Sequence, residues 1–366
     1  MRDATLVTTP EQLDAAAFRL QGANRLAIDT EFMRERTYSP QLCLVQVASD
    51  ADCWLVDPLA GLDLAPLLAT LAERDRPKIL HAARQDLEVL LNAGGTVPGP
   101  VFDTQVAAAL LGLPPQVGYA ELVARRLGHS IDKGQTRTDW SRRPLSDAQL
   151  AYAADDVHHL LELHSDLVAA LESKGRASWH AEDCAALEDP RLYRTDPADA
   201  WRRLKGLGRL RPAEQAVARA LAGWREQRAI TSDKPRGWII TDEALYALAT
   251  VLPASLQELE QVRSLPPAVV RKRGEELLGL INDAVESARG IPPTAPPQRP
   301  TSEQTRRIGL LQQRLRDIAA ALEISPEVLA TRRDVEGMVL GDPSQSPLLR
   351  GWRGAVVGRP LLELLD

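Results

Sequence analysis

Short apolar runs alternate with segments of helical spacing through the first half of the chain. The apolar runs predict strands at 25–32, 42–49, 53–57 and 78–82, each bounded by turn residues. Apolar residues three and four positions apart predict helices at 62–73, 84–95 and 146–173. The last helix begins with Ser146 and Gln149, which form a capping-box pattern. Strands that alternate with helices predict an α/β fold around a mixed sheet.

The pattern changes near residue 175, after which helical spacing dominates. Helices are predicted at 212–231, 243–249, 254–263 and 266–289. These helices share a compact apolar set: Leu221, Trp224, Leu245, Leu248, Leu256, Leu259, Leu277 and Ile281. A proline-rich stretch at 290–304 indicates an extended linker, and a last helical segment follows. We therefore expect an α/β domain at 1–178 and two all-α domains at 208–289 and 304–366.

The composition is that of an ordinary globular protein. Of 366 residues, 44% are hydrophobic and 26% are charged, and no apolar run approaches the roughly 18 residues of a membrane span. The N-terminus lacks the apolar stretch of a signal peptide, so we expect a cytoplasmic protein. Three cysteines at scattered positions indicate neither a disulfide framework nor a zinc site. The net charge of −6 argues mildly against non-specific nucleic-acid binding but leaves room for a local basic stripe.

Two carboxylates, Asp29 and Glu31, interrupt the apolar strand "LAIDTEF" at 26–32. Residues two apart in a strand share a face, so both carboxylates point the same way, beside Ala27. Leu26 and Ile28 fall on the opposite face with Thr30 and Phe32, where they can pack into a core. A D-x-E pair in isolation is most often a solvated strand end. Further acidic residues close to this pair would instead indicate a site for a divalent metal ion, because hard cations take oxygen ligands and offset the repulsion between like charges.

Further acids occur near the starts of helices and on the long helix. Asp86 lies in the first turns of the helix at 84–95, where an acid alone complements the helix dipole, and Asp103 is a favoured N-cap. In "YAADD", Tyr152 and Asp156 are spaced i, i+4. At about 100° per residue, Asp156 lies about 40° from Tyr152 and Asp155 about 60° to the other side, so spacing alone leaves both acids open.

Asp29, Glu31, Asp86 and Asp156 come from three separate elements, and a two-metal site needs a cluster of acids of this kind. Carboxylates suit Mg²⁺ or Mn²⁺ rather than zinc. Arg137, Arg142 and Arg143 precede the long helix and could hold a polyanion backbone, as could the basic run at 202–211, for which a solvated linker-and-helix face is the alternative interpretation.

Aromatic rings near these residues have more ordinary interpretations. We interpret Trp140 as an anchor of its loop, although it could stack a base. His158, His159 and His164 have no His-x-x-x-His spacing, and we interpret them as solvated or packing residues.

The order of these motifs resembles the DEDD superfamily of 3′–5′ exonucleases, in its tyrosine-containing branch. The segments "TYSPQLCLVQVAS", "FDTQVAAALLG" and "KGQTRTDWSRRPLSDAQLAYAADDV" are similar to the ribonuclease D family. Residues 212–287 and 304–364 are similar to its two C-terminal HRDC (helicase and RNase D C-terminal) modules. The resemblance implies a ribonuclease H-like mixed sheet flanked by helices, followed by two all-α modules.

The resemblance also implies roles for individual residues. Asp29, Glu31, Asp86 and Asp156 match the four acids that bind two divalent cations, Mg²⁺ or Mn²⁺. Tyr152 matches the tyrosine that orients the attacking water. In the family the metal-binding aspartate follows this tyrosine by four residues, which favours Asp156 over Asp155.

The implied activity is 3′–5′ exoribonuclease trimming of tRNA precursors and other structured RNAs by two-metal-ion hydrolysis. We expect the enzyme to release nucleoside 5′-monophosphates from the RNA. We also expect it to be a monomer that binds RNA with a single-stranded 3′ end and does not bind membranes. Two other hypotheses remain: a catalytically silent RNA-binding protein, and a single-stranded DNA exonuclease of the same superfamily.

Overall fold

A computed structural model describes residues 4–131, 134, 138–289 and 300–365. The chain divides into two compact units. The first unit draws on residues 1–33, 42–190 and 300–366, and the second on residues 34–41 and 191–299. Chain segments that are far apart in sequence therefore share one unit, and each unit is described separately below.

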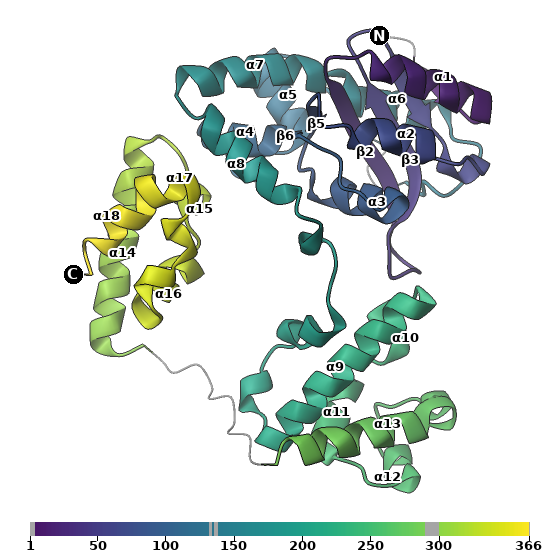
Figure 1. Ribbon diagram of the computed structural model, residues 1–366, viewed down its shortest axis with the longest axis vertical. Helices are drawn as coiled ribbons and strands as arrows, with labels where there is room; N and C mark the ends of the chain where they lie inside the picture. Colours follow the sequence, from purple (N-terminus) through teal and green to yellow (C-terminus); the bar gives the residue numbers. More distant parts are fainter. Residues whose placement is uncertain (1–3, 132–133, 135–137, 290–299, 366) are drawn as a thin grey trace. The chain divides into compact units, whose positions relative to one another are not determined.

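A six-stranded mixed sheet forms the centre of the first unit, as predicted (Figure 1). Its order is β1-β4-β3-β2-β5-β6. The strands are β1 (Ala4–Val7), β2 (Leu26–Met33), β3 (Gln41–Ala48), β4 (Cys53–Val56), β5 (Lys78–Leu80) and β6 (Val101–Asp103). β4 runs parallel to β1 and antiparallel to β3, while β5 runs parallel to both β2 and β6. β2 thus occupies a central position, where its neighbours fix its register.

Helices flank this sheet, and one of them covers the face of β2 that carries the acids. The helices are α1 (Pro10–Gln21), α2 (Ala65–Ala72), α3 (Arg84–Gly94), α4 (Thr104–Leu110), α5 (Tyr119–Leu127), α6 (Asp147–His158), α7 (Leu160–Ser173) and α8 (Ala177–Leu187). α6 packs against β2 and β4. Its buried Ala153 and Val157 belong to the same apolar cluster as Ala27 of β2. α6 therefore lies over the side of β2 to which residues 27, 29 and 31 point.

The predicted single helix at 146–173 is wrong, because the structure has two helices there. Ser146 and Gln149 form the predicted capping box at the start of α6. α6 ends at His158, and α7 begins after His159, whose carbonyl accepts the hydrogen bond from the Leu163 N–H at 2.9 Å. Apolar spacing continues through the break without glycine or proline, so the pattern carries no signal for it.

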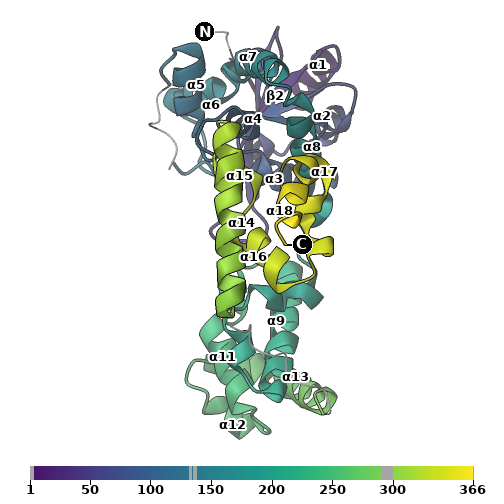
Figure 2. The same cartoon turned by 90° about the vertical axis from the view of Figure 1, so that its left-hand side faces the viewer.

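The C-terminal segment packs into the first unit. It contains α14 (Ser302–Ala321), α15 (Pro326–Leu329), α16 (Arg332–Leu340), α17 (Gly351–Arg353) and α18 (Arg359–Leu362), with α14 as the longest (Figure 2). Trp352 stacks on Trp179 of α8, with ring centroids 4.4 Å apart and planes 6° from parallel. Arg353 pairs with Asp183 of α8. The expectation that 304–366 is a separate domain stays a prediction, but its apolar core is continuous with that of the sheet.

The second unit is all-α, as predicted. It contains α9 (Pro212–Ser232), α10 (Arg236–Ile239), α11 (Asp242–Val251), α12 (Leu256–Glu260) and α13 (Pro267–Ser287). α11 and α13 both pack against α9, and Leu221, Leu245 and Leu277 are fully buried between them. Leu256 is an exception to the predicted apolar set, because 43% of it is exposed. Residues 290–299 of the predicted linker lie outside the described residues.

Among the described residues, no helix is both long and apolar enough to cross a bilayer. All three cysteines are buried, and no disulfide joins them.

Candidate active site

Three carboxylates meet where α6 crosses β2. Asp29 and Glu31 lie half-buried on the same face of β2, as the alternation of strand side chains predicts. Asp156 of α6 joins them, and one oxygen from each of the three carboxylates lies within 4.8 Å of the others. The packing of α6 on the sheet thus brings together acids that are more than 120 residues apart in sequence.

Asp86 lies in the first turn of α3 and is only 7% exposed. The Thr30 hydroxyl donates a hydrogen bond of 2.6 Å to Asp86 Oδ1. Thr30 is buried, as expected, but it also fixes this carboxylate, a role that strand alternation does not reveal. The charge of Asp86 raises the pKa of Asp29, so Asp86 lies close enough to act on the cluster.

Asp155 and Asp156 point to different surroundings. The Tyr152 phenol hydrogen-bonds to the Asp156 carboxylate, which belongs to the cluster. The carboxylate of Asp155 is not part of that cluster, and its backbone carbonyl accepts a 3.0 Å hydrogen bond from the Tyr119 hydroxyl. The structure therefore places Tyr152 and Asp156 together on the side facing β2. Tyr119 is a neighbour that the sequence analysis missed, since no local spacing relates it to α6.

Burial is the largest cause of a raised pKa at all four acids. The pKa of Glu31 rises from 4.5 to about 8, and the charges of Asp156 and Asp86 add to the effect of burial. Burial also raises the pKa of Asp86 and that of Asp156 from 3.8 to about 7, and the bond from Tyr152 moderates the rise at Asp156. The pKa of Asp29 rises well above 3.8 through burial and the charges of the other three. The site thus resists full ionisation unless positive charge is added.

The donor set fits hard divalent cations. Carboxylate oxygens are the ligands that Mg²⁺ and Mn²⁺ prefer, and the cluster offers neither thiolate nor imidazole. Each neighbouring charge that raises a pKa within the cluster is another carboxylate. A bound cation would remove this repulsion, so these side chains suit divalent metal ions.

Asp103 positions the start of α3. Its carboxylate caps α4 by accepting from the Gln105 and Val106 N–H groups, which confirms the N-cap prediction. It also accepts from the Ala82 and Ala83 N–H groups, at 3.1 and 2.8 Å. One carboxylate therefore fixes the turn that leads to Asp86, a contact across 20 residues that a local N-cap pattern does not predict.

The basic residues before α6 have different surroundings. Arg143 forms a two-pronged ion pair with Asp57, at 2.6 and 2.7 Å, and donates to the carbonyl of Cys43. This arginine therefore supports the fold, contrary to its expected availability for RNA. Arg142 is exposed, and Arg137 lies outside the described residues. Trp140 is 2% exposed, which confirms that it anchors its loop.

Two protein-family descriptions match the chain. Residues 4–172 match the 3′–5′ exonuclease family, and residues 214–281 match the HRDC domain. The matched ranges correspond to the sheet-containing unit with its carboxylate cluster and to the core of the second, all-α unit.

Known proteins resemble the chain over nearly its whole length. Ribonuclease D of Acidiphilium cryptum is 40% identical over 99% of this chain and 93% of its own. Ribonuclease D of Gluconacetobacter diazotrophicus is 40% identical over 100% and 93%. The crystal structure of Escherichia coli RNase D, described as an exoribonuclease involved in structured RNA processing, superposes with a TM-score of 0.88 at 33% identity, covering 99% of this chain and 98% of that one. The chain therefore belongs to the ribonuclease D family of 3′–5′ exoribonucleases.

Proposed function

We propose that the carboxylate cluster is a two-metal active site that trims the 3′ ends of tRNA precursors and other structured RNAs. Asp29, Glu31, Asp86 and Asp156 would hold two divalent cations, Mg²⁺ or Mn²⁺, and Tyr152 would orient the attacking water. The observation that carries this proposal is the convergence of three carboxylates within 4.8 Å, beside a buried Asp86.

The cations, when bound, supply the positive charge that activates water and stabilises the departing oxygen of a phosphodiester. The protein's own contribution is position. Thr30 fixes the Asp86 carboxylate, and Asp103 fixes the turn before it. The Tyr152 phenol lies against Asp156, where it can hydrogen-bond to a water at the edge of the cluster.

The proposed substrate is RNA with a single-stranded 3′ end. The involvement of the Escherichia coli relative in structured RNA processing supports this choice. Within the second unit, Arg202 and Arg203 are 67% and 55% exposed in their side chains. Arg202 pairs with Asp199 on the same short segment, whereas Arg203 donates to Thr195 and also lies 3.8 Å from Glu226 of α9. The exposed parts of both side chains can still meet a phosphate.

A cleavage assay tests the proposal. The full chain is incubated with a 3′-extended tRNA and with single-stranded DNA of matched sequence, in Mg²⁺, Mn²⁺ or EDTA, and the products are resolved by length. We expect stepwise loss of nucleoside 5′-monophosphates from the tRNA with either metal and none with EDTA. Internal fragments, or full activity in EDTA, would contradict the mechanism.

The same assay separates the two other hypotheses. Binding of the tRNA without any cleavage would support the silent RNA-binding protein. Faster shortening of the DNA would support the DNA exonuclease. The Asp156→Asn variant serves as the control, because it keeps the shape of the side chain while removing a proposed ligand.

A further inference from the structure

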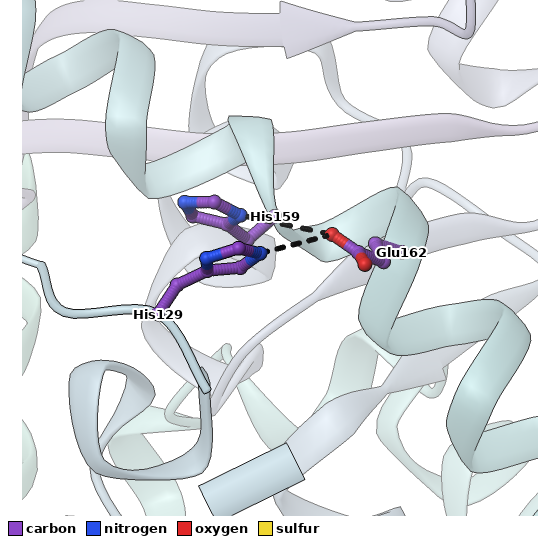
Figure 3. Close-up of side chains that lie close together, drawn as sticks. All are labelled: His129, His159 and Glu162. Atoms are coloured by element: carbon purple, nitrogen blue, oxygen red, sulfur yellow. Dashed lines mark ion pairs between the residues drawn. The ribbon is translucent and has the colours of Figure 1, made fainter. Parts of the chain in front are cut away.

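A second group of side chains with possible metal-ligand atoms lies outside the carboxylate cluster. It consists of His129, His159 and Glu162, and one donor atom from each lies within 4.8 Å of the others. Figure 3 shows the two rings stacked, each with a nitrogen facing the same oxygen of Glu162. His129 Nε2 and His159 Nδ1 lie 3.9 and 4.0 Å from that oxygen. We propose that this histidine cluster binds a divalent transition-metal ion of the zinc type.

The backbone holds the three residues in place from separate elements. α5 ends at Leu127, and its C-cap Gly128 is in the left-handed conformation with φ of 73°. The chain then turns to place His129 beside His159. Arg126 in the last turn of α5 forms a two-pronged ion pair with Asp166 of α7, at 2.6 and 2.9 Å. The ion pair between α5 and α7 therefore holds the backbone around the three donor residues in place without any bound ion.

The distances suit an ion better than a direct contact. At 3.9 and 4.0 Å the histidine nitrogens are too far from Glu162 for hydrogen bonds. A tetrahedral zinc ion, with bonds of about 2.0–2.1 Å, sets its ligands about 3.3–3.4 Å apart. His129 and Glu162 have side chains that are 52% and 59% exposed, so small rotations can close the remaining gap. Water would complete the coordination on the exposed side.

The chemistry of the donors distinguishes this site from the active site. Two imidazoles and one carboxylate prefer zinc, cobalt or nickel ions, whereas the carboxylate cluster prefers magnesium or manganese. His159 was expected to be solvated or packing, because spacing within one helix relates it to no second ligand. The partner, His129, lies 30 residues earlier and no helical period reaches it.

Cobalt absorption tests the proposal with the full chain. Co²⁺ is added in the presence of excess Mg²⁺, the visible ligand-field bands are recorded, and Zn²⁺ is then added as a competitor. We expect the parent to bind Co²⁺ at this site and to release it to Zn²⁺. His129→Gln and Glu162→Gln change exposed residues and should each weaken the apparent affinity about 10-fold or more.

Two further variants locate the ion. His158→Gln alters a neighbouring histidine outside the cluster, and Asp29→Asn alters the proposed active site, so both should keep the signal. Zn²⁺ should also raise the melting temperature of the parent and of His158→Gln but leave His129→Gln unchanged. Absence of Co²⁺ bands in the parent would overturn the proposal. So would a signal that survives His129→Gln but disappears in Asp29→Asn, because the ion would then lie among the carboxylates.

Discussion

Replacement of Glu31 by glutamine should stabilise the metal-free protein while abolishing its activity. Glu31 lies among other carboxylates, and burial with the charges of Asp156 and Asp86 raises its pKa from 4.5 to about 8. The folded state therefore binds more protons than the unfolded state between these two pH values. Stability must fall as the pH rises through that window, and the contribution vanishes below about pH 4.5, where both states are protonated. Glutamine is neutral in both states and escapes this loss.

The magnitude follows from the pKa difference. At about pH 7 Glu31 is ionised in the unfolded state and largely protonated in the folded state. This difference lowers the free energy of unfolding of the parent by about 3 kcal/mol, at about 1.4 kcal/mol per pKa unit. Partial exposure of Glu31 and screening by salt reduce the expected effect to about 1–2 kcal/mol. Bound Mg²⁺ should stabilise the parent more than Glu31→Gln, because only the parent keeps the full negative charge.

Urea unfolding in EDTA measures the effect, at about pH 8 and again at about pH 4. We expect Glu31→Gln to unfold at a higher urea concentration than the parent at the higher pH, and at a similar concentration at the lower pH. Asp155→Asn is the matched control: its carboxylate lies outside the cluster but its charge raises the pKa of Asp156, so we expect a smaller rise in the urea midpoint than for Glu31→Gln. A Glu31→Gln variant that is less stable than the parent in EDTA at about pH 8 would refute the argument from repulsion.

The remaining predictions concern catalysis, pH and chain length. Asp156→Asn should lower turnover about 10³-fold or more and Asp155→Asn only a few-fold, measured as release of mononucleotides; the reverse order would shift the ligand assignment by one residue. Tyr152→Phe should lower turnover about 10²-fold while Mg²⁺ binding, measured by calorimetry, is nearly unchanged, and a large loss of binding would contradict its role toward water. Burial lowers the pKa of His164 from 6.5 to about 4, so the unfolded state binds more protons between these values and the stability of the parent should fall as the pH drops through them. His164→Gln should flatten this dependence in urea unfolding, and equal slopes would rule out His164 as its source. Removal of 300–366 should lower the melting temperature of the sheet-containing unit, because that segment shares its apolar core; an unchanged melting temperature would show that the segment is an independent domain.

Local rules predicted the parts of the site that lie within one element. Strand alternation placed Asp29 and Glu31 on one face of β2, and helical geometry left Asp155 and Asp156 as alternatives on α6. The family resemblance favoured Asp156, but local rules could not choose, because the choice depends on the packing of α6 against β2, a contact between distant segments. The structure supplies it by placing Asp156 in the cluster and by bonding the carbonyl of Asp155 to Tyr119.

Features that depend on non-local pairing escaped the sequence analysis. β1 is only four residues long, so its sequence pattern is too short to predict a strand. The strand forms because it pairs in parallel with β4, almost 50 residues later in the chain. Arg143 was expected to be available to RNA, but Asp57, 86 residues earlier, occupies its guanidinium group. The sequence gives the position of an arginine in the chain, but it does not predict which carboxylate will pair with that arginine in the folded protein.

One helix links the two proposed ion-binding clusters. α6 carries Tyr152 and Asp156 on the side facing β2, and it ends immediately before His159. An ion bound by the histidine cluster would therefore restrain the end of the helix that orients the proposed catalytic groups, without contributing a ligand to the carboxylates. Because imidazole and carboxylate donors prefer different metals, zinc can act on the stability of this helix while magnesium acts on the reaction. On these two proposals α6 would carry a magnesium-type site on the side facing β2 and a zinc-type site at its end, and the repulsion among carboxylates would act at the first site alone.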